Sequence, residues 1–260
     1  MQLEIEELLS IAKDAGKVVL AVYNDSEKAE EVKYKTDESP LTLADEASNE
    51  LIVNRLKTFT PEIPILSEEG QNIPYEERKD WEYFWCVDPL DGTKEFINRN
   101  GEFTINIALI HNRVPVLGVI YVPVTDTLYY ANQETGGWKI TSDGVKSAMK
   151  VDKNSVDWVS VGSRSHAAPA ETEVLARYPI VKNVAIGSSL KFCLVAEGEA
   201  HIYFRHGPTM EWDTAAGQAI LTLSGGKMTK LSGEPFLYNK SSLLNGSFIC
   251  SAQHLTLRDE

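Results

Sequence analysis

The sequence predicts an α+β fold in its first half and an α/β fold in its second half. Two amphipathic helical patterns come first, followed by extended segments joined by short turns. After residue 150, short apolar strands alternate with helical patterns, which is typical of α/β proteins. A chain of 260 residues suits one large domain or two closely packed ones.

The predicted helices of the first half are indicated by the spacing of their apolar residues. Residues 3–23 repeat apolar side chains at helical intervals beneath an acidic outer face. Residues 44–56 place Ala44, Leu51 and Leu56 on one side of a second helix. Residues 24–40 are charged and poor in apolar groups, so we expect a surface loop there.

The extended segments that follow predict a sheet. Residues 83–87 form an apolar run that we expect to be a buried strand stopping at Asp88-Pro89. Residues 103–110 and 114–122 predict neighbouring antiparallel strands joined by a short turn. Shorter strands are expected at residues 63–67, 127–131 and 138–140.

The second half follows a polar link near residue 150. We therefore expect an N-terminal α+β subdomain over residues 1–150 and a C-terminal α/β subdomain over residues 151–260. The expected strands are residues 158–161, 181–186, 201–204, 227–231 and 248–251, and the expected helices are residues 169–177, 190–197 and 213–223.

Composition excludes several classes of protein. The formal net charge of −13 is too acidic for a protein that wraps a nucleic-acid polymer, because that binding requires excess Lys and Arg. No apolar stretch approaches the ~20 residues of a transmembrane helix, and the N-terminus does not resemble a secretory signal. The three cysteines form no CxxC pair, so we expect reduced core thiols and a cytoplasmic location.

Acidic residues occur repeatedly at the ends of predicted elements. Carboxylates at such positions can converge on one cleft while the strands and helices themselves stay buried. The acids are Asp45, Glu68, Glu69, Asp88, Asp91, Glu211 and Asp213.

The segment Asp88-Pro89-Leu90-Asp91-Gly92-Thr93 concentrates this chemistry. Pro89 favours an extended Asp88, Leu90 offers a carbonyl, and Asp91 should cap a helix. Gly92 permits close approach of a ligand, and the first free N–H groups of the helix would form an anion site. Hard oxygen ligands suit Mg²⁺, and two such ions would clamp the attacking and leaving oxygens of a phosphoryl transfer.

Each acidic feature taken alone has a simpler interpretation. The central segment could be a turn before a capped helix, and Glu68-Glu69 a solvated loop. Asp213 could be a plain N-cap, and Asp45 a first-turn acid that complements the helix dipole. The metal-site hypothesis therefore depends on all of these acids occurring together.

The motifs resemble those of the inositol monophosphatase superfamily. Residues 88–93 (DPLDGT) and 212–217 (WDTAAG) match its paired signatures, and residues 39–45 and 67–70 fit in the same order. Finer detail is similar to the bacterial 3′(2′),5′-bisphosphate nucleotidase branch. That detail lies in residues 93–97, 99–104, 162–166, 187–193 and 207–213.

The resemblance implies a layered αβαβα sandwich and Mg²⁺ as the cofactor. It assigns a first ion to Glu68, Asp88 and the Leu90 carbonyl, and a second to Asp88, Asp91 and Asp213. A third, weaker ion would lie near Glu68. Most of these ligands belong to the first subdomain, and Asp213 to the second. A water activated with help from Glu68 and Thr93 would attack the phosphate, with Asp45 orienting Thr93.

The resemblance also implies a nucleotide pocket. An acidic protein cannot attract a phosphate dianion through its overall field, so local cations are needed. Lys191 and Arg205, with Ser188 as a hydroxyl donor, would hold the 5′-phosphate side, and His166 would stack on adenine. From the sequence alone, Lys191 could instead be a solvated helix residue and His166 an exposed loop residue. Substrate contacts are further expected from Glu68, Leu90, Asp91, Gly92, Thr93 and Asp213.

The implied activity is hydrolysis of the 3′-phosphate of adenosine 3′,5′-bisphosphate to AMP and phosphate, a step of sulfur assimilation that Li⁺ should inhibit. The alternatives are an inositol monophosphatase or fructose 1,6-bisphosphatase of the same superfamily, and a non-catalytic nucleotide- or metal-binding module. Peripheral attachment to the inner membrane, the oligomeric state and the choice between 3′- and 2′-phosphate are left open by the sequence.

Overall fold

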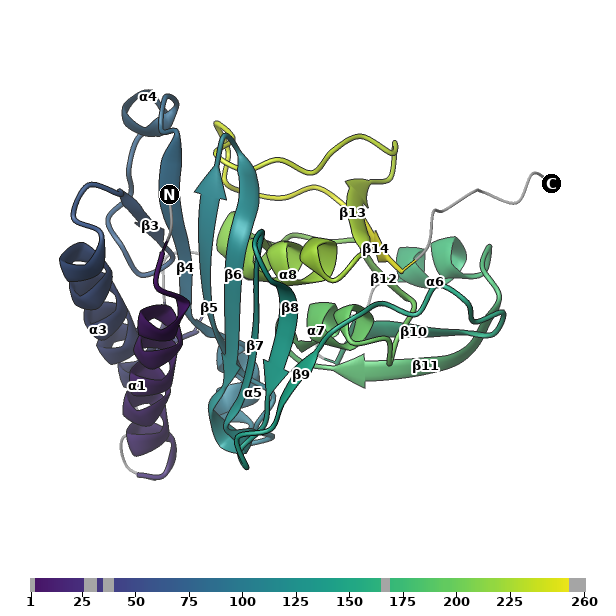
Figure 1. The fold of residues 1–260 in the computed structure, drawn as a ribbon, viewed down its shortest axis with the longest axis horizontal. Coiled ribbons are helices and arrows are strands. Elements are labelled where there is room, and N and C mark those ends of the chain that lie inside the picture. Colours follow the sequence, from purple (N-terminus) through teal and green to yellow (C-terminus); the bar gives the residue numbers. More distant parts are fainter. Residues whose placement is uncertain (1–2, 26–31, 35–39, 165–168, 253–260) are drawn as a thin grey trace.

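The computed structural model describes residues 3–25, 32–34, 40–164 and 169–252. Its elements form five layers, with helices on both outer faces and a pair of helices between two sheets (Figure 1). The αβαβα sandwich expected from the family resemblance is therefore confirmed. None of the helices in the described part of the chain combines the length and apolar character needed to cross a bilayer.

The first sheet has seven strands in the order β3-β4-β5-β6-β7-β8-β9. Only β3 and β4 pair in parallel, and the other neighbours are antiparallel. The sequence missed β9 because its three residues are all exposed and carry no apolar alternation. The strands are β3 (Ile65–Ser67), β4 (Tyr83–Asp91), β5 (Thr104–His111), β6 (Val114–Val122), β7 (Thr127–Asn132), β8 (Gly136–Ile140) and β9 (Lys146–Ala148).

Two helices cover the outer face of this sheet, α1 (Ile5–Tyr23) and α3 (Leu43–Phe59). Their buried faces pack on β4, β5 and β6 in a core that includes Leu8, Ile52 and Trp85. Between these helices, residues 24–40 are not wholly loop, since β1 (Val32–Tyr34) and β2 (Pro40–Thr42) form a short antiparallel pair.

The second sheet has five strands in the order β11-β10-β12-β14-β13. The parallel strands are β10 (Trp158–Ser163), β11 (Ile180–Ile186) and β12 (Ile202–Arg205), and the antiparallel additions are β13 (Lys227–Lys230) and β14 (Phe248–Ser251). Helix α6 (Pro169–Leu175) covers its outer face. The strand and helix alternation expected after residue 150 is thus present, while the division into subdomains at that residue stays a prediction.

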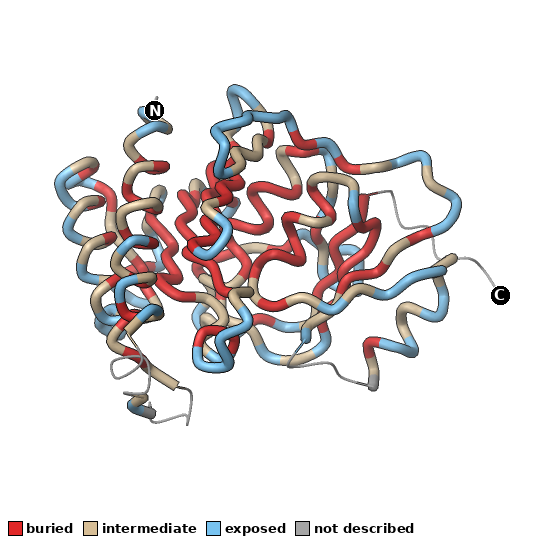
Figure 2. Tube along the Cα trace, turned by 90° about the horizontal axis from the view of Figure 1, so that it is seen from below, coloured by how far each residue is buried: buried red, intermediate tan, exposed pale blue. Residues whose placement is uncertain are grey.

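The middle layer consists of α7 (Leu190–Ala196) and α8 (Glu211–Leu223). Buried residues from both sheets meet these helices in one continuous core, and Figure 2 shows burial concentrated in the sheets and the helices between them. Helix α8 lies close on β6, because a Cβ at Gly118 would stand 2.5 Å from the Ala216 carbonyl oxygen. This close packing brings the first turn of α8 toward the ends of the central strands.

The central segment differs from its predicted local structure. Strand β4 does not stop at Asp88 but continues to Asp91, with a register irregularity between these residues. Gly92, not Asp91, is the N-cap of the five-residue helix α5 (Thr93–Ile97), and its φ of +90° favours glycine. Asp91 stays in the strand, since Thr104 of β5 still pairs with it. The anion site expected at the Gly92 and Thr93 N–H groups stays a prediction.

Candidate active site

Three carboxylates from separate parts of the chain converge between the two sheets. Glu68 follows β3, Asp88 lies within β4, and Asp213 lies in the first turn of α8. One oxygen from each lies within 4.8 Å of the others. Asp88 is buried, and the other two are partly exposed. This is the convergence that the scattered acidic residues predicted.

Regular pairing explains the meeting of Glu68 and Asp88. Parallel β3 and β4 place Ser67 opposite Val87, and the Glu68 N–H donates to the Val87 carbonyl at 3.1 Å. The residue that follows each member of this pair is an acid, Glu68 after Ser67 and Asp88 after Val87. Asp213 arrives with α8 and is not an N-cap, since it accepts a hydrogen bond from the Met210 N–H at 2.8 Å as the third residue of the helix. A sheet register and a helix start together fix the cluster.

Without a bound cation, the negative charges of the clustered carboxylates repel one another. Burial, with repulsion from Glu68, Asp91 and Asp213, raises the pKa of Asp88 well above its usual range. Burial and repulsion from Asp91 and Glu68 do the same for the pKa of Asp213. Buried carboxylates held this close need positive charge among them. Hard oxygen donors in this arrangement fit a divalent cation such as Mg²⁺.

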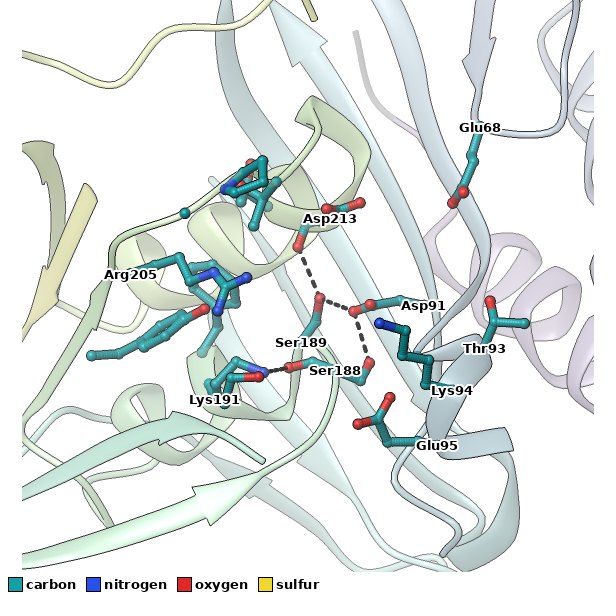
Figure 3. Close-up of a pocket in the computed structure, with 18 of the residues that line it drawn as sticks. Glu68, Asp91, Thr93, Lys94, Glu95, Ser188, Ser189, Lys191, Arg205 and Asp213 are labelled. Atoms are coloured by element: carbon teal, nitrogen blue, oxygen red, sulfur yellow. Dashed lines mark hydrogen bonds between the residues drawn. The ribbon is translucent and has the colours of Figure 1, made fainter. Parts of the chain in front are cut away.

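Asp91 stands beside this trio, with its carboxylate directed to the second half of the chain. Its Oδ2 accepts from Asn106 Nδ2 at 3.2 Å, Ser188 Oγ at 2.7 Å and Ser189 Oγ at 2.6 Å. Ser189 Oγ also lies 2.9 Å from the Asp213 carbonyl oxygen, so it bridges the two acidic segments (Figure 3). The sequence analysis missed Asn106 and Ser189, although Ser189 lies inside the quoted segment 187–193.

Thr93 and Asp45 also meet as expected. The Thr93 hydroxyl lies 3.3 Å from Asp45 Oδ1 and 3.4 Å from the Leu90 carbonyl oxygen. Asp45 Oδ2 accepts from both the N–H and the hydroxyl of Thr42, at 2.7 and 2.6 Å, which locks this carboxylate in a helix capping box. Asp45 therefore belongs to the capping box of α3, in which Thr42 is the N-cap, and also lies next to Thr93.

A cavity of ≈ 540 Å³ opens over these groups. The acidic end presents Glu68, Asp91, Thr93 and Asp213, and the other end contains cationic side chains from the second half of the chain (Figure 3). Among the further lining residues that the sequence analysis did not assign are Lys94, Glu95, Tyr203 and His206. Lys94 and Glu95 follow the metal-site motif directly, which is the signal that could have found them.

The cationic end is built from Lys191 and Arg205. Both are buried, so Lys191 is not a solvated helix residue. The ammonium group of Lys191 donates to the Ser188 carbonyl, and burial lowers the pKa of Lys191 to about 8. Arg205 Nη1 lies 3.8 Å from Glu171 Oε1. Ser188 Oγ contacts Asp91 and Thr104, and His166 lies outside the described residues.

Comparison with known proteins identifies the family of the chain. The model of the inositol monophosphatase family matches residues 2–258. The chain belongs to this family. The motif resemblance is thereby confirmed, and a metal-dependent phosphatase site agrees with the observed carboxylate cluster.

Several similar proteins of known name are CysQ proteins. The chain is 46% identical to the 3′(2′),5′-bisphosphate nucleotidase CysQ of Salmonella typhimurium over 94% of this chain and 98% of the relative. It is 44% identical, with the same coverage, to CysQ of Escherichia coli K12. The crystal structure of CysQ from Bacteroides thetaiotaomicron shares 42% identity with a TM-score of 0.83, over 95% of this chain and 96% of that one.

Proposed function

We propose that this protein is a Mg²⁺-dependent 3′(2′),5′-bisphosphate nucleotidase that converts adenosine 3′,5′-bisphosphate to AMP and phosphate. The observation that carries this proposal is the two-ended cavity. Glu68 and Asp213, two of the three clustered carboxylates, line one end, and Lys191 and Arg205 line the other. A substrate with two phosphates matches both ends. The identity to CysQ proteins over nearly the whole chain supports the same activity.

The metal would be held mainly by side chains that the structure brings together. Glu68, Asp88 and the Leu90 carbonyl would take one ion, and Asp88, Asp91 and Asp213 a second, with a third ion near Glu68. When bound, Mg²⁺ supplies positive charge that acidifies water and offsets the charge of the reacting phosphate. Two to three ions would also offset the repulsion that raises the pKa values of Asp88 and Asp213.

Thr93 and Asp45 orient the attacking water through a chain of hydrogen bonds. Because the Thr93 hydroxyl donates its hydrogen toward Asp45 Oδ1, its oxygen is left to accept a hydrogen bond from water. Asp45 cannot turn away, since Thr42 holds its other oxygen twice. The Glu68 carboxylate is the second group that accepts a hydrogen bond from this water. Water oriented in this way attacks phosphorus in line with the departing ribose 3′-oxygen.

Lys191 and Arg205 select a substrate that carries a second phosphate. The chain has a net charge of −13, so its overall field repels a dianion and these local cations must hold it. Arg205 offers a planar fork that can take two phosphate oxygens, and Lys191 offers a compact charge. Inositol 1-phosphate has no second phosphate for this end of the cavity.

A side-by-side hydrolysis assay tests the proposal. With Mg²⁺ present, we expect phosphate release from adenosine 3′,5′-bisphosphate at a kcat/KM at least about tenfold above that for inositol 1-phosphate, which lacks a second phosphate, since one charged hydrogen bond is worth about that factor. Fructose 1,6-bisphosphate also carries two phosphates, so the same assay with this sugar tests whether the nucleoside part of the substrate is required. EDTA should abolish release, and millimolar Li⁺ should reduce it. A preference for inositol 1-phosphate would assign a different phosphatase activity, and binding without release would indicate a non-catalytic module.

A further inference from the structure

We propose that the segment 237–245, together with Arg78, is a clamp that positions Asp213 for metal binding. The inference rests on the proposed metal site but not on the identity of the substrate. It concerns Glu211 and Lys240, which are not among the described residues that line the cavity. They are positioning residues, acting through the first turn of α8.

The clamp begins with a buried acid two residues before Asp213. Glu211 has no exposed surface, and its carboxylate lies on the segment 237–245. Glu211 Oε2 accepts from the Asn239 N–H at 2.7 Å, and Oε1 accepts from the Lys240 N–H at 3.0 Å and from Lys240 Nζ at 2.6 Å. Three hydrogen bonds, one of them from a cation, anchor the first residue of α8.

Asn245 holds the backbone immediately before the helix. Its N–H donates to the Thr209 carbonyl at 2.8 Å, and its side-chain amide donates to the Met210 carbonyl at 2.7 Å. Lys240 Nζ in turn donates to Asn245 Oδ1 at 2.9 Å, which joins this contact to the Glu211 pair. Since the Met210 N–H binds Asp213 Oδ2, the residue that fixes the Asp213 carboxylate is itself fixed by the clamp.

Arg78 ties the same segment to the connection that carries Glu68. Arg78 is buried in α4 (Tyr75–Arg78), which lies between Glu68 and β4. Its Nη1 donates to Asn239 Oδ1 at 2.8 Å and to the Lys240 carbonyl at 2.7 Å. The Asn239 amide donates back to the Arg78 carbonyl at 2.6 Å. One segment thus fastens both the β3–β4 connection and the start of α8.

These contacts hold the three carboxylates of the cluster close together although they repel one another. Asp88 lies on β4, which is paired on both sides, but Glu68 lies in a connection and Asp213 at a helix start, and the three carboxylates repel one another. Removal of residues that orient metal ligands without binding the metal typically lowers metal affinity about 10–100-fold. Loosening the clamp should therefore raise the Kd for a divalent cation, while the protein stays folded.

The test compares two lysine variants in the full chain. Lys240→Met breaks the Glu211 pair, and Lys139→Met breaks the Lys139–Glu197 pair. Both lysines lie 2.6 Å from a glutamate oxygen with side chains 28% and 27% exposed. Lys139 lies on β8, which is separated from β4 by three strands of the sheet, and it pairs with Glu197 at the end of α7. It is therefore a matched control at the end of α7 opposite to Ser189.

The readout is calorimetric binding of Mn²⁺ without substrate, together with the melting temperature. We expect Lys240→Met to raise the Mn²⁺ Kd about 10–100-fold and Lys139→Met to change it less than about twofold, at similar losses of melting temperature. Glu211→Gln, which keeps the shape, should weaken binding to a smaller extent, and Lys240→Arg should restore much of it.

Equal Mn²⁺ affinities for the two lysine variants, or normal affinity in Glu211→Gln and Lys240→Met, would overturn the clamp. Because the Mn²⁺ binding measurement uses no nucleotide, its conclusion about the clamp does not depend on the outcome of the hydrolysis assay. Absence of Mn²⁺ binding in the unmodified protein would instead remove the metal site on which both proposals rest.

Discussion

The acidic and cationic ends of the cavity are built in different ways. The acidic end is assembled from regular structure, with Glu68 and Asp88 set by parallel strand pairing and Asp213 by a helix start. The cationic residues also lie on regular elements, Lys191 in α7 and Arg205 in β12, but their charged groups are held by local contacts. Lys191 donates to the Ile186 and Ser188 carbonyls, and Arg205 faces Glu171. The difference suggests that the acidic end sets the reaction and the cationic end selects the substrate.

Removing an acid should give the largest effect. Asp88→Asn, Asp91→Asn and Asp213→Asn should each lower kcat on the order of 10³-fold on every phosphate ester, because each weakens the positive charge held at the reacting phosphate. Circular dichroism should show an intact fold. The melting temperature of metal-free Asp213→Asn should equal or exceed that of the unmodified protein, since a repelled charge is gone. Unchanged turnover in any of the three variants would remove that acid from the metal site.

Removing a cation should affect one substrate class. Lys191→Ala and Arg205→Ala should each raise KM for adenosine 3′,5′-bisphosphate about 10–100-fold, the worth of a charged hydrogen bond. KM for inositol 1-phosphate, measured in the same preparations, should change less than about threefold. Equal changes for both substrates would contradict the division between the two ends.

The pKa of Lys191 adds a pH signature to the cationic end. Because this pKa is lowered to about 8, the lysine is charged at neutral pH and loses its proton as the pH rises through about 8. We expect kcat/KM for the bisphosphate to fall above that pH, and the fall should move to higher pH in Lys191→Arg, whose guanidinium stays charged. A pH profile that Lys191→Arg leaves unchanged would assign the fall to another group.

Ser189 bridges the two acidic segments, and its removal should have a smaller effect. Ser189→Ala removes the hydroxyl that bridges Asp91 Oδ2 and the Asp213 carbonyl. We expect Mg²⁺ half-saturation of activity to rise about tenfold, with little change in KM for the nucleotide. Ser188→Ala is the neighbouring comparison, since Ser188 contacts Asp91 but not Asp213. A pure loss of melting temperature in Ser189→Ala would reduce Ser189 to a packing role.

The sequence was most informative where acidic residues lie at the ends of predicted strands and helices. Asp45, Glu68, Asp88 and Asp213 could be grouped because each acid follows or opens a predicted element. The local form of the Asp88–Thr93 segment could not, because the irregularity in β4 is set by pairing with β5, which is remote in sequence. Ser189 and Asn106 were missed for the same reason, since their role is visible only once α7 and β5 flank Asp91.

The most direct test of the metal site is anomalous diffraction from crystals soaked in Mn²⁺. The structure predicts a strong peak among the carboxylates of Glu68, Asp88 and Asp213, and loss of that peak in Asp88→Asn. A fully soaked crystal with Mn²⁺ bound elsewhere, and no peak among these three carboxylates, would contradict the assignment of this cluster as the catalytic metal site.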